Sequence, residues 1–137
     1  MKLNTYLHFS SGKCEEALNF YVKVLGAQPI MMLHYGEGAQ KNDETKGMEQ
    51  KIMHGRIALG DTVIMASDAP PGYFSKLTGF SINIGVETPE EAERLFKLLS
   101  ENAEIGMPMA GTFWAHRFGM LTDQFGVPWM VNCEKKA

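Results

Sequence analysis

Two residues of this chain, His54 and Arg56, have side chains suited to acid–base and anion chemistry and stand two positions apart. An imidazole titrates near neutral pH, so His54 can serve as a general base; a hydrogen-bonded place within a sheet is the other interpretation. The planar guanidinium of Arg56 suits a bidentate clamp on a ligand carboxylate or phosphate, and a structural ion pair is its alternative. These two residues are the candidates for catalysis.

The other reactive side chains do not match a known catalytic motif. The sequence contains no GxSxG, P-loop, GxGxxG or HExxH motif. Ser67 and Asp68 are neighbours, but the members of a catalytic triad have to meet in space rather than in sequence. A metal site built from histidines would need the fold to bring together three that are far apart in the sequence, namely His8, His54 and His116.

Cys14 and Cys133 lie at opposite ends of the chain, and no CxxC or Cys/His ligand spacing is present. We therefore expect free thiols rather than a disulfide framework. Cys14 falls in the expected first turn of a helix, where the helix dipole can lower the pKa of a thiol. The other interpretation makes it a small packing residue.

Length and composition set limits on the kind of protein. The 137 residues are 45% hydrophobic and 21% charged, which is typical of one soluble globular domain. The net charge of −3 and the lack of a basic run disfavour nucleic acid and an anionic membrane surface as partners. No apolar run could span a membrane, and polar residues interrupt the start where a signal peptide would be apolar, so we expect a cytoplasmic protein. The chain contains ten methionines, an unusually high number. Their flexible side chains can either fill an irregular core or line a ligand pocket.

The elements that must position these residues occur twice. Residues 15–21 (EEALNFY) resemble residues 90–96 (EEAERLF) at an offset of 75, and both segments carry apolar residues at helical spacing. Gly26 is expected to end the first helix as a C-cap. Thr88 is expected to be the N-cap of the second helix, with Pro89 at its first position and Glu91 completing a capping box. The acidic pairs thus indicate helix starts rather than a catalytic dyad.

Strands surround both helices. Alternating segments 3–9 and 79–84 precede the helices, further strands are expected around 29–35 and 105–113, and hairpins follow at 54–67 and 116–132. A polar loop at 36–50 is expected to be mobile, and residues 69–77 link the halves. The order is therefore βαβββ twice, an α+β class, with modules of about 1–68 and 78–137 that form a single domain.

Four further motifs carry a resemblance to a known superfamily. They are FYxxxLG at 20–26, IMASD at 64–68, TFWAHxFG at 112–119 and DxFGVPWM at 123–130. With the paired modules, they resemble the vicinal oxygen chelate superfamily of glyoxalase I, bleomycin resistance proteins and extradiol dioxygenases, and within it the PhnB-like branch. The resemblance implies that the two modules form a cupped, eight-stranded mixed sheet, usually in a homodimer.

In metal-using relatives, equivalent strand positions of the two modules supply four ligands, typically two His and two Glu. Carried over residue by residue, the resemblance places these positions at Asn4, Met65, Gly79 and Met130. Glycine offers no side chain, and a thioether is a poor ligand for hard divalent ions. We therefore expect no metal and no cofactor, and the metal-dependent activities of the superfamily are not expected here.

A cupped sheet without metal still presents a concave face, and strand alternation predicts what lines it. If Gly60 and Asp61 form a two-residue turn, Arg56 lies opposite Met65 and His54 opposite Ser67. Trp114 and Trp129 are candidates for pocket walls, for dimer anchors or for the core. The expected ligand-binding residues are mostly apolar or aromatic with a few polar groups: Tyr6, His8, His54, Arg56, Met65, Ser81, Trp114, His116, Met130 and Asn132.

The leading hypothesis is a cytoplasmic homodimer that binds a small, partly apolar molecule without metal, as drug-sequestering members of the superfamily do. The alternative is an enzyme of lyase, isomerase or dioxygenase type, using His54 and Arg56 or an atypical histidine metal site. A third possibility is an interaction module that recruits a partner through residues 37–51. No glycine-rich strand–turn–helix loop suited to S-adenosylmethionine is present, and no residue indicates phosphonate chemistry.

Overall fold

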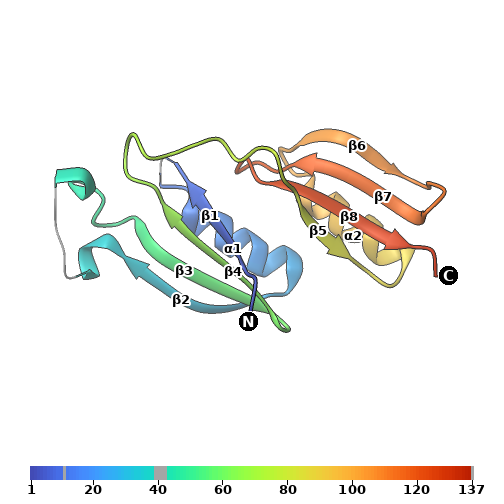
Figure 1. The fold of residues 1–137 in the computed structure, drawn as a ribbon, viewed down its shortest axis with the longest axis horizontal. Coiled ribbons are helices and arrows are strands. Elements are labelled where there is room, and N and C mark those ends of the chain that lie inside the picture. Colours follow the sequence, from blue (N-terminus) through green and yellow to red (C-terminus); the bar gives the residue numbers. More distant parts are fainter. Residues whose placement is uncertain (11, 39–42, 137) are drawn as a thin grey trace. The chain divides into compact units, whose positions relative to one another are not determined.

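The computed structural model describes residues 1–10, 12–38 and 43–136. The chain divides into two compact units, Met1–Ser75 and Lys76–Ala137, each of which is described by itself (Figure 1). Each unit contains one helix and a mixed four-stranded sheet in the order βαβββ. The α+β class and the two βαβββ modules predicted from the sequence are therefore confirmed.

The first module contains β1 (Thr5–Phe9), α1 (Cys14–Leu25), β2 (Gln28–His34), β3 (Ile52–Leu59) and β4 (Thr62–Asp68). The sheet order is β1-β4-β3-β2, with β1 parallel to β4 and the other pairs antiparallel. Gly26 ends α1 in the left-handed region, at φ 69°, as the sequence predicts. Helix α1 covers one face of the sheet (Figure 1). It approaches β3 so closely that a Cβ on Gly55 would stand 2.6 Å from Leu18 Cδ1.

A buried carboxylate ties three elements of this module together. Asp68, at the end of β4, is 1% exposed. Its Oδ1 accepts from the Cys14 backbone N–H at 2.9 Å and its Oδ2 from the Ile52 N–H at 2.8 Å. Its carbonyl accepts from the Tyr35 hydroxyl at 2.7 Å, and burial together with the Asp68 charge raises the pKa of Tyr35. Asp68 is thus a structural residue that fixes β4 against α1 and β3.

The polar loop after β2 is anchored where the structure describes it. Short 3₁₀ turns occupy Tyr35–Glu37 and Asp43–Thr45, the Gly36 N–H donates to the Glu49 carbonyl at 3.0 Å, and Met48 is 2% exposed. Residues 39–42 of this loop lie outside the described part of the chain. Because Met48 is buried, the residues that lead from the second 3₁₀ turn to β3 pack against the module.

The second module contains β5 (Ile82–Gly85), α2 (Pro89–Leu99), β6 (Glu104–Ala110), β7 (Ala115–Thr122) and β8 (Pro128–Glu134). The sheet order is β5-β8-β7-β6, with β5 parallel to β8. Thr88 caps α2 by accepting from the Glu91 N–H at 3.2 Å, and Pro89 opens the helix, as the sequence predicts. The Glu91 carboxylate accepts two hydrogen bonds from Arg94 on the next turn.

The core of the second module settles the alternatives for Trp129. This residue is 1% exposed, and its Nε1 donates to Oδ2 of buried Asp123 at 2.7 Å. Oδ1 of the same carboxylate accepts from the N–H groups of Phe125 and Val127. Trp129 is therefore a core residue, whereas Trp114 is 41% exposed.

Of the two interpretations of Cys14, a pKa lowered by the helix dipole is wrong. Cys14 is 0% exposed, and burial, with the charges of Asp68 and Glu15 adding to it, raises the pKa of the thiol. Desolvation of a thiolate outweighs the dipole at this position. Both cysteines are free and buried, so the packing interpretation holds. None of the described helices is long and apolar enough to span a membrane.

Strand pairing also corrects the equivalence of the two first strands. The repeat offset matches His8 with Asn83 and places the ligand positions at Asn4 and Gly79, but β1 begins at Thr5 and β5 at Ile82. In the sheets, Tyr6 pairs with Met65 and Asn83 pairs with Met130. Tyr6 therefore corresponds to Asn83. The helix repeat does not continue in register into the strands, because the segments that join strand to helix differ in length.

Candidate ligand-binding faces of the two sheets

A row of four side chains crosses the sheet face of the first module that lies away from α1. Met31 pairs with Arg56, Arg56 pairs with Met65, and Met65 pairs with Tyr6. Residues paired across strands project from the same face. Gly55 faces α1, so its neighbour Arg56 projects from the opposite face. We call Met31, Arg56, Met65 and Tyr6 the Arg56 row.

The predicted turn at Gly60 and Asp61 and the pairing of Arg56 with Met65 are both present. The guanidinium of Arg56 is the cation within the Arg56 row. Its Nε is buried and has no hydrogen-bond partner within the described residues. A buried, unpaired donor costs free energy, roughly 1–3 kcal/mol, which a ligand acceptor would recover. Arg56 is therefore the polar group of this face that is best placed to hold an anion.

Aromatic and imidazole rings gather at one end of the Arg56 row. The Tyr6 hydroxyl lies 3.2 Å from His54 Nδ1, within hydrogen-bond distance. The Tyr6 ring centroid is 4.9 Å from that of His8 and 5.7 Å from that of His54. His8 pairs with buried Ser67 on β4. The structure thus brings together Tyr6, His8 and His54, three of the residues expected from the sequence.

The corresponding row of the second module is richer in sulfur. Met107 pairs with Met120, Met120 with Met130, and Met130 with Asn83. We call these four residues the methionine row. Gly119 faces α2, where a Cβ would stand 2.7 Å from Phe96 Cε2, so the methionine row projects from the face away from that helix. Thioether side chains adapt their shape to an apolar ligand.

Next to the methionine row, Phe118 pairs with Asn132. The Trp114 ring lies edge-on to Phe118, with centroids 5.4 Å apart, and Phe113, which contacts Trp114, is 88% exposed. Trp114 therefore borders this open face. His116 is exposed at a register shift between Ala115 and Arg117, and Ser81 is half-buried just before β5.

Met31, Met107 and Met120 belong to these rows, although the ligand-binding residues expected from strand alternation do not include them. Register shifts interrupt β2 between Pro29 and Met31 and β6 between Ile105 and Met107. A bulge reverses which residues face one side of a sheet. Simple alternation therefore fails in both edge strands, and no sequence signal locates the bulges.

The corrected pairing also changes the test of a metal site. On the first and fourth strands of each module, the paired positions are Tyr6 with Met65 in the first module and Asn83 with Met130 in the second. Two thioethers, an amide and a phenol do not suit a hard divalent ion. Within the described residues, no group of three His, Cys, Asp or Glu side chains could hold a metal ion. The donor set does not fit the metal chemistry of the superfamily.

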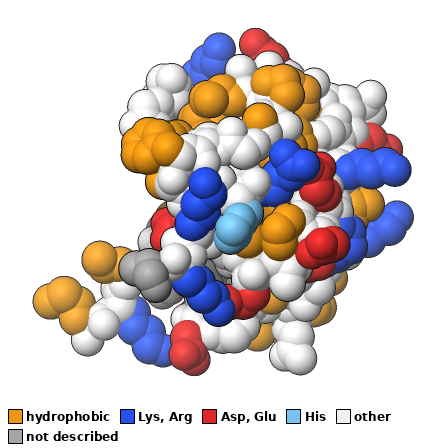
Figure 2. Space-filling view, turned by 90° about the vertical axis from the view of Figure 1, so that its right-hand side faces the viewer, with side chains coloured by type: hydrophobic (Ala, Val, Ile, Leu, Met, Phe, Trp, Pro, Cys, Tyr) orange, Lys and Arg blue, Asp and Glu red, His pale blue; other side chains and the backbone are white. Residues whose placement is uncertain are grey.

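Charges do not form a field of one sign on the face in Figure 2, where acidic and basic side chains are intermixed with hydrophobic ones. Several are paired locally, as in Arg117 with Glu93 at 3.0 Å and Arg94 with Glu91 at 2.6 Å. The charges visible on this face are therefore mixed in sign rather than gathered into one patch.

The two βαβββ modules with their mixed four-stranded sheets define a class, the glyoxalase/bleomycin resistance fold. A glyoxylase/bleomycin resistance protein/dioxygenase domain from Frankia sp. EAN1pec matches 98% of this chain and 98% of its own, with a TM-score of 0.68 and 12% identity, a likeness that shows the fold alone. The family model described as 3-demethylubiquinone-9 3-methyltransferase matches residues 1–132. The chain therefore belongs to this family, the PhnB-like branch of the fold.

Individual relatives support the same assignment. Protein YjdN of Escherichia coli (strain K12) is 38% identical, over 99% of this chain and 97% of its own length. The crystal structure of protein PA1353 from Pseudomonas aeruginosa is 41% identical, with a TM-score of 0.86 over 98% of this chain and 100% of that one. A putative 3-demethylubiquinone-9 3-methyltransferase, PhnB protein, from Bacillus cereus is 27% identical, with a TM-score of 0.81 over 97% and 99% of the two chains.

Proposed function

We propose that this PhnB-like protein binds a small, partly apolar molecule that carries a carboxylate or phosphate, and that it does so without metal. The observation that carries the proposal is the buried, unpaired Nε of Arg56 between Met31 and Met65. An anion on the ligand would pair with the guanidinium, while its apolar part would contact the thioethers and the Tyr6 ring. The residues expected to take part are those of the Arg56 row, with His54 and His8 beside Tyr6.

An acid–base role for His54 is less well supported than binding. Its Nδ1 lies 3.2 Å from the Tyr6 hydroxyl, an interaction that orients the imidazole within the sheet. Orientation of this kind also serves ligand recognition. The enzyme alternative therefore has no observation of its own, and binding is the function that the geometry supports best.

The experiment compares matched anionic and neutral probes by thermal unfolding. Benzoate and octanoate are titrated beside benzyl alcohol and octanol. A ligand at a hundred times its Kd stabilises the native state by roughly 2.7 kcal/mol, so saturating carboxylate should raise Tm measurably. Arg56→Met removes the cation while keeping apolar bulk, and should abolish the response to carboxylates.

Arg117→Met is the matched control, since Arg117 is a half-exposed partner of Glu93 in the second module. It should respond to the carboxylates like the original protein. If no carboxylate raises Tm, or if Arg56→Met responds as strongly as the original protein, the proposed role of Arg56 is refuted.

The homodimer and the cytoplasmic location also belong to this proposal. Phe113, 88% exposed, and Trp114, 41% exposed, form a contiguous aromatic surface. Aromatic residues are enriched at protein interfaces, so this surface is the candidate anchor of a dimer. Light scattering from the purified chain gives its mass in solution directly.

A further inference from the structure

Two connecting segments of the first module meet at one end of its sheet. Because β3 and β4 are antiparallel, the segment that leads into β3 and the segment that leaves β4 lie at the same end (Figure 1). There the Tyr73 hydroxyl donates a hydrogen bond to Glu44 Oε1 at 2.6 Å. Both residues belong to the first compact unit. This contact joins the linker after β4 to the second 3₁₀ turn.

The contact borders a hollow of about 320 Å³ at the ends of β1 and β4. His8 and Ser67, which pair across these strands, line the hollow from the sheet, and the two residues of the contact line it from the connecting segments. Ser67 is 7% exposed, whereas Tyr73 is 62% exposed. His8 projects from the same face as Tyr6, so the hollow continues the face that carries the Arg56 row.

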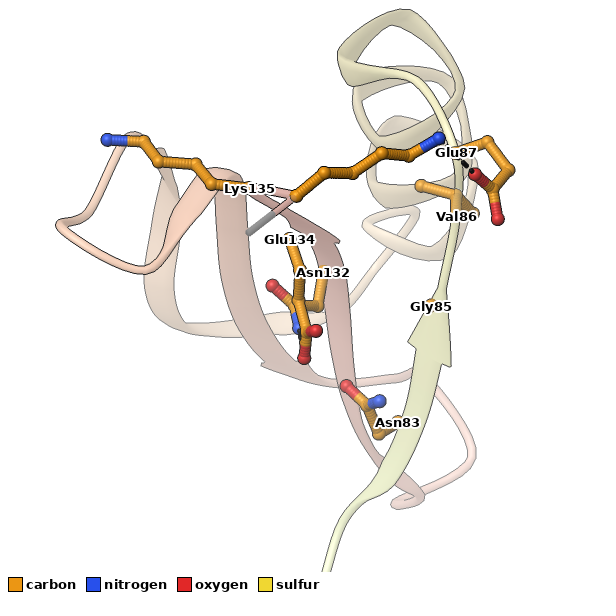
Figure 3. Close-up of a pocket in the computed structure, with 8 residues that line it drawn as sticks. Asn83, Gly85, Val86, Glu87, Asn132, Glu134 and Lys135 are labelled. Carbon is orange, nitrogen blue, oxygen red and sulfur yellow. Dashed lines mark hydrogen bonds and ion pairs between the residues drawn. The ribbon is translucent and has the colours of Figure 1, made fainter.

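The corresponding hollow of the second module has a different kind of rim. It lies at the ends of β5 and β8, where Gly85 pairs with Asn132. Figure 3 shows the ion pair at its edge, in which Glu87 and Lys136 are 3.5 Å apart and almost fully exposed. Exposed pairs of long side chains contribute little, because holding them in one geometry costs side-chain entropy. The rim contact of the first module instead uses the rigid ring of Tyr73.

Each of the two segments has a glycine between the contact and a fixed point of the chain. Gly72 precedes Tyr73 at φ 88°, and Gly47 follows the 3₁₀ turn at φ 84°; a Cβ on either would meet nothing within 4 Å. Glycine adopts and leaves such conformations at little steric cost. Beyond these glycines, the Ala69 N–H donates to the carbonyl of the last β1 residue at 2.8 Å, and Met48 is 2% exposed. The two short segments can therefore separate while the sheet stays in place.

We propose that Tyr73 and Glu44 form a latch, which opens and closes the outer side of this hollow and so controls access to Ser67. A single hydrogen bond between exposed side chains adds little to stability, so the latch can open locally without unfolding of the module. In the closed state the hydroxyl remains a donor, because its hydrogen bond to Glu44 and the charge of that carboxylate raise the pKa of Tyr73.

The regulatory meaning of the latch rests on the proposed function. A molecule held by Arg56 would extend along the face into the hollow, and a closed latch would then slow its release. Lid movements of this kind limit the release of ligands from many proteins. The movement itself can be tested without any ligand.

The substitution Ser67→Cys places a thiol on the inner side of the hollow, and its alkylation by iodoacetamide, followed by mass spectrometry, reports on access. The buried Cys14 and Cys133 give the background, which is measured in the chain without this substitution. Tyr73→Phe removes the hydroxyl but keeps the ring, and Glu44→Ala removes the acceptor. Each should speed alkylation roughly two- to tenfold, the range that corresponds to the loss of one hydrogen bond.

Asp43→Ala is the matched control for Glu44→Ala, because Asp43 lies in the same 3₁₀ turn and does not line the hollow. The variant with both Tyr73→Phe and Glu44→Ala should be alkylated no faster than either single variant, because the two changes remove the same contact. The latch is refuted if the single variants are alkylated at the original rate, if Asp43→Ala speeds alkylation as much, or if the two effects add.

The dissociation rate of octanoate, measured by NMR exchange, separates the latch from the proposed function. Faster dissociation from Tyr73→Phe than from the original protein supports the regulatory role. An unchanged rate refutes that role. If octanoate does not bind while the alkylation responds as expected, the proposed function fails and the latch is retained.

Discussion

The carboxylate of Asp68 offers the sharpest test of how the Arg56 row is held in place. It accepts one backbone N–H from the start of α1 and one from the start of β3, at 2.9 and 2.8 Å, and it is 1% exposed. Asp68 lies at the end of β4, the strand that carries Met65 and Ser67. The substitution Asp68→Asn keeps the shape and removes the charge and one acceptor.

The expected cost can be worked from these contacts. A hydrogen bond to a charged group contributes roughly 1.5–3 kcal/mol, and Asn retains one acceptor of the two. Its NH₂ group must also face a backbone N–H that is left unpaired in the interior. The free energy of unfolding should therefore fall by about 2–4 kcal/mol, which lowers Tm by roughly 10 °C for a domain of this size.

Urea unfolding followed by circular dichroism measures this change through the midpoint at constant m. Asp61→Asn is the matched control, because Asp61 is an exposed residue of the β3–β4 turn and should change stability by less than about 0.5 kcal/mol. An Asp68→Asn variant within about 1 kcal/mol of the original protein would show that the two backbone bonds do not fix β4 as argued.

Two further predictions concern the cores. Gly119→Ala should destabilise the second module by about 1–3 kcal/mol, because its Cβ would stand 2.6 Å from Met109 Sδ and 2.7 Å from the rigid Phe96 ring. Gly106→Ala is the control in thermal unfolding, because the nearest atom to its Cβ would be 3.6 Å away. Equal Tm values for the two variants would contradict the close packing at Gly119. Cys14 should react with a thiol reagent only after unfolding, because burial raises its pKa and covers the sulfur. Since the folded thiol holds its proton more tightly than the unfolded one, Cys14 should also make stability fall as the pH rises above the usual thiol range, and Cys14→Ala should lessen that fall in urea unfolding at alkaline pH. Rapid labelling of native protein at neutral pH would contradict this account.

Local signals predicted most of the fold. The helical spacing of apolar residues predicted both helices, and Gly26 and Thr88 predicted where one ends and the other begins. Capping depends on a few adjacent residues, so it can be recognised in the sequence. The turn at Gly60 and Asp61 fixed the pairing of Arg56 with Met65, since a two-residue turn leaves one register. These features are short-range, which is why a single sequence contains them.

Long-range features escaped prediction. The equivalence of Tyr6 with Asn83 depends on strand pairing, and the positions of Met31 and Met107 depend on bulges in β2 and β6. The pKa of Cys14 follows from tertiary burial, which outweighs the helix dipole. The unpaired Oδ1 of Asn132 depends on which acceptor its Nδ2 reaches. None of these has a signature in the spacing of neighbouring residues.

The methionine row has a chemical consequence of its own. Met107, Met120 and Met130 place three sulfur atoms on adjacent strands of one open face, and Met107 is 47% exposed. Oxidation of a thioether to a sulfoxide turns a flexible apolar side chain into a polar, chiral one. A peroxide that reached this face would therefore replace apolar thioether surface with polar sulfoxide groups. Methionine sulfoxide reductases reverse this change, so the polarity of this face would follow the balance between oxidation and repair.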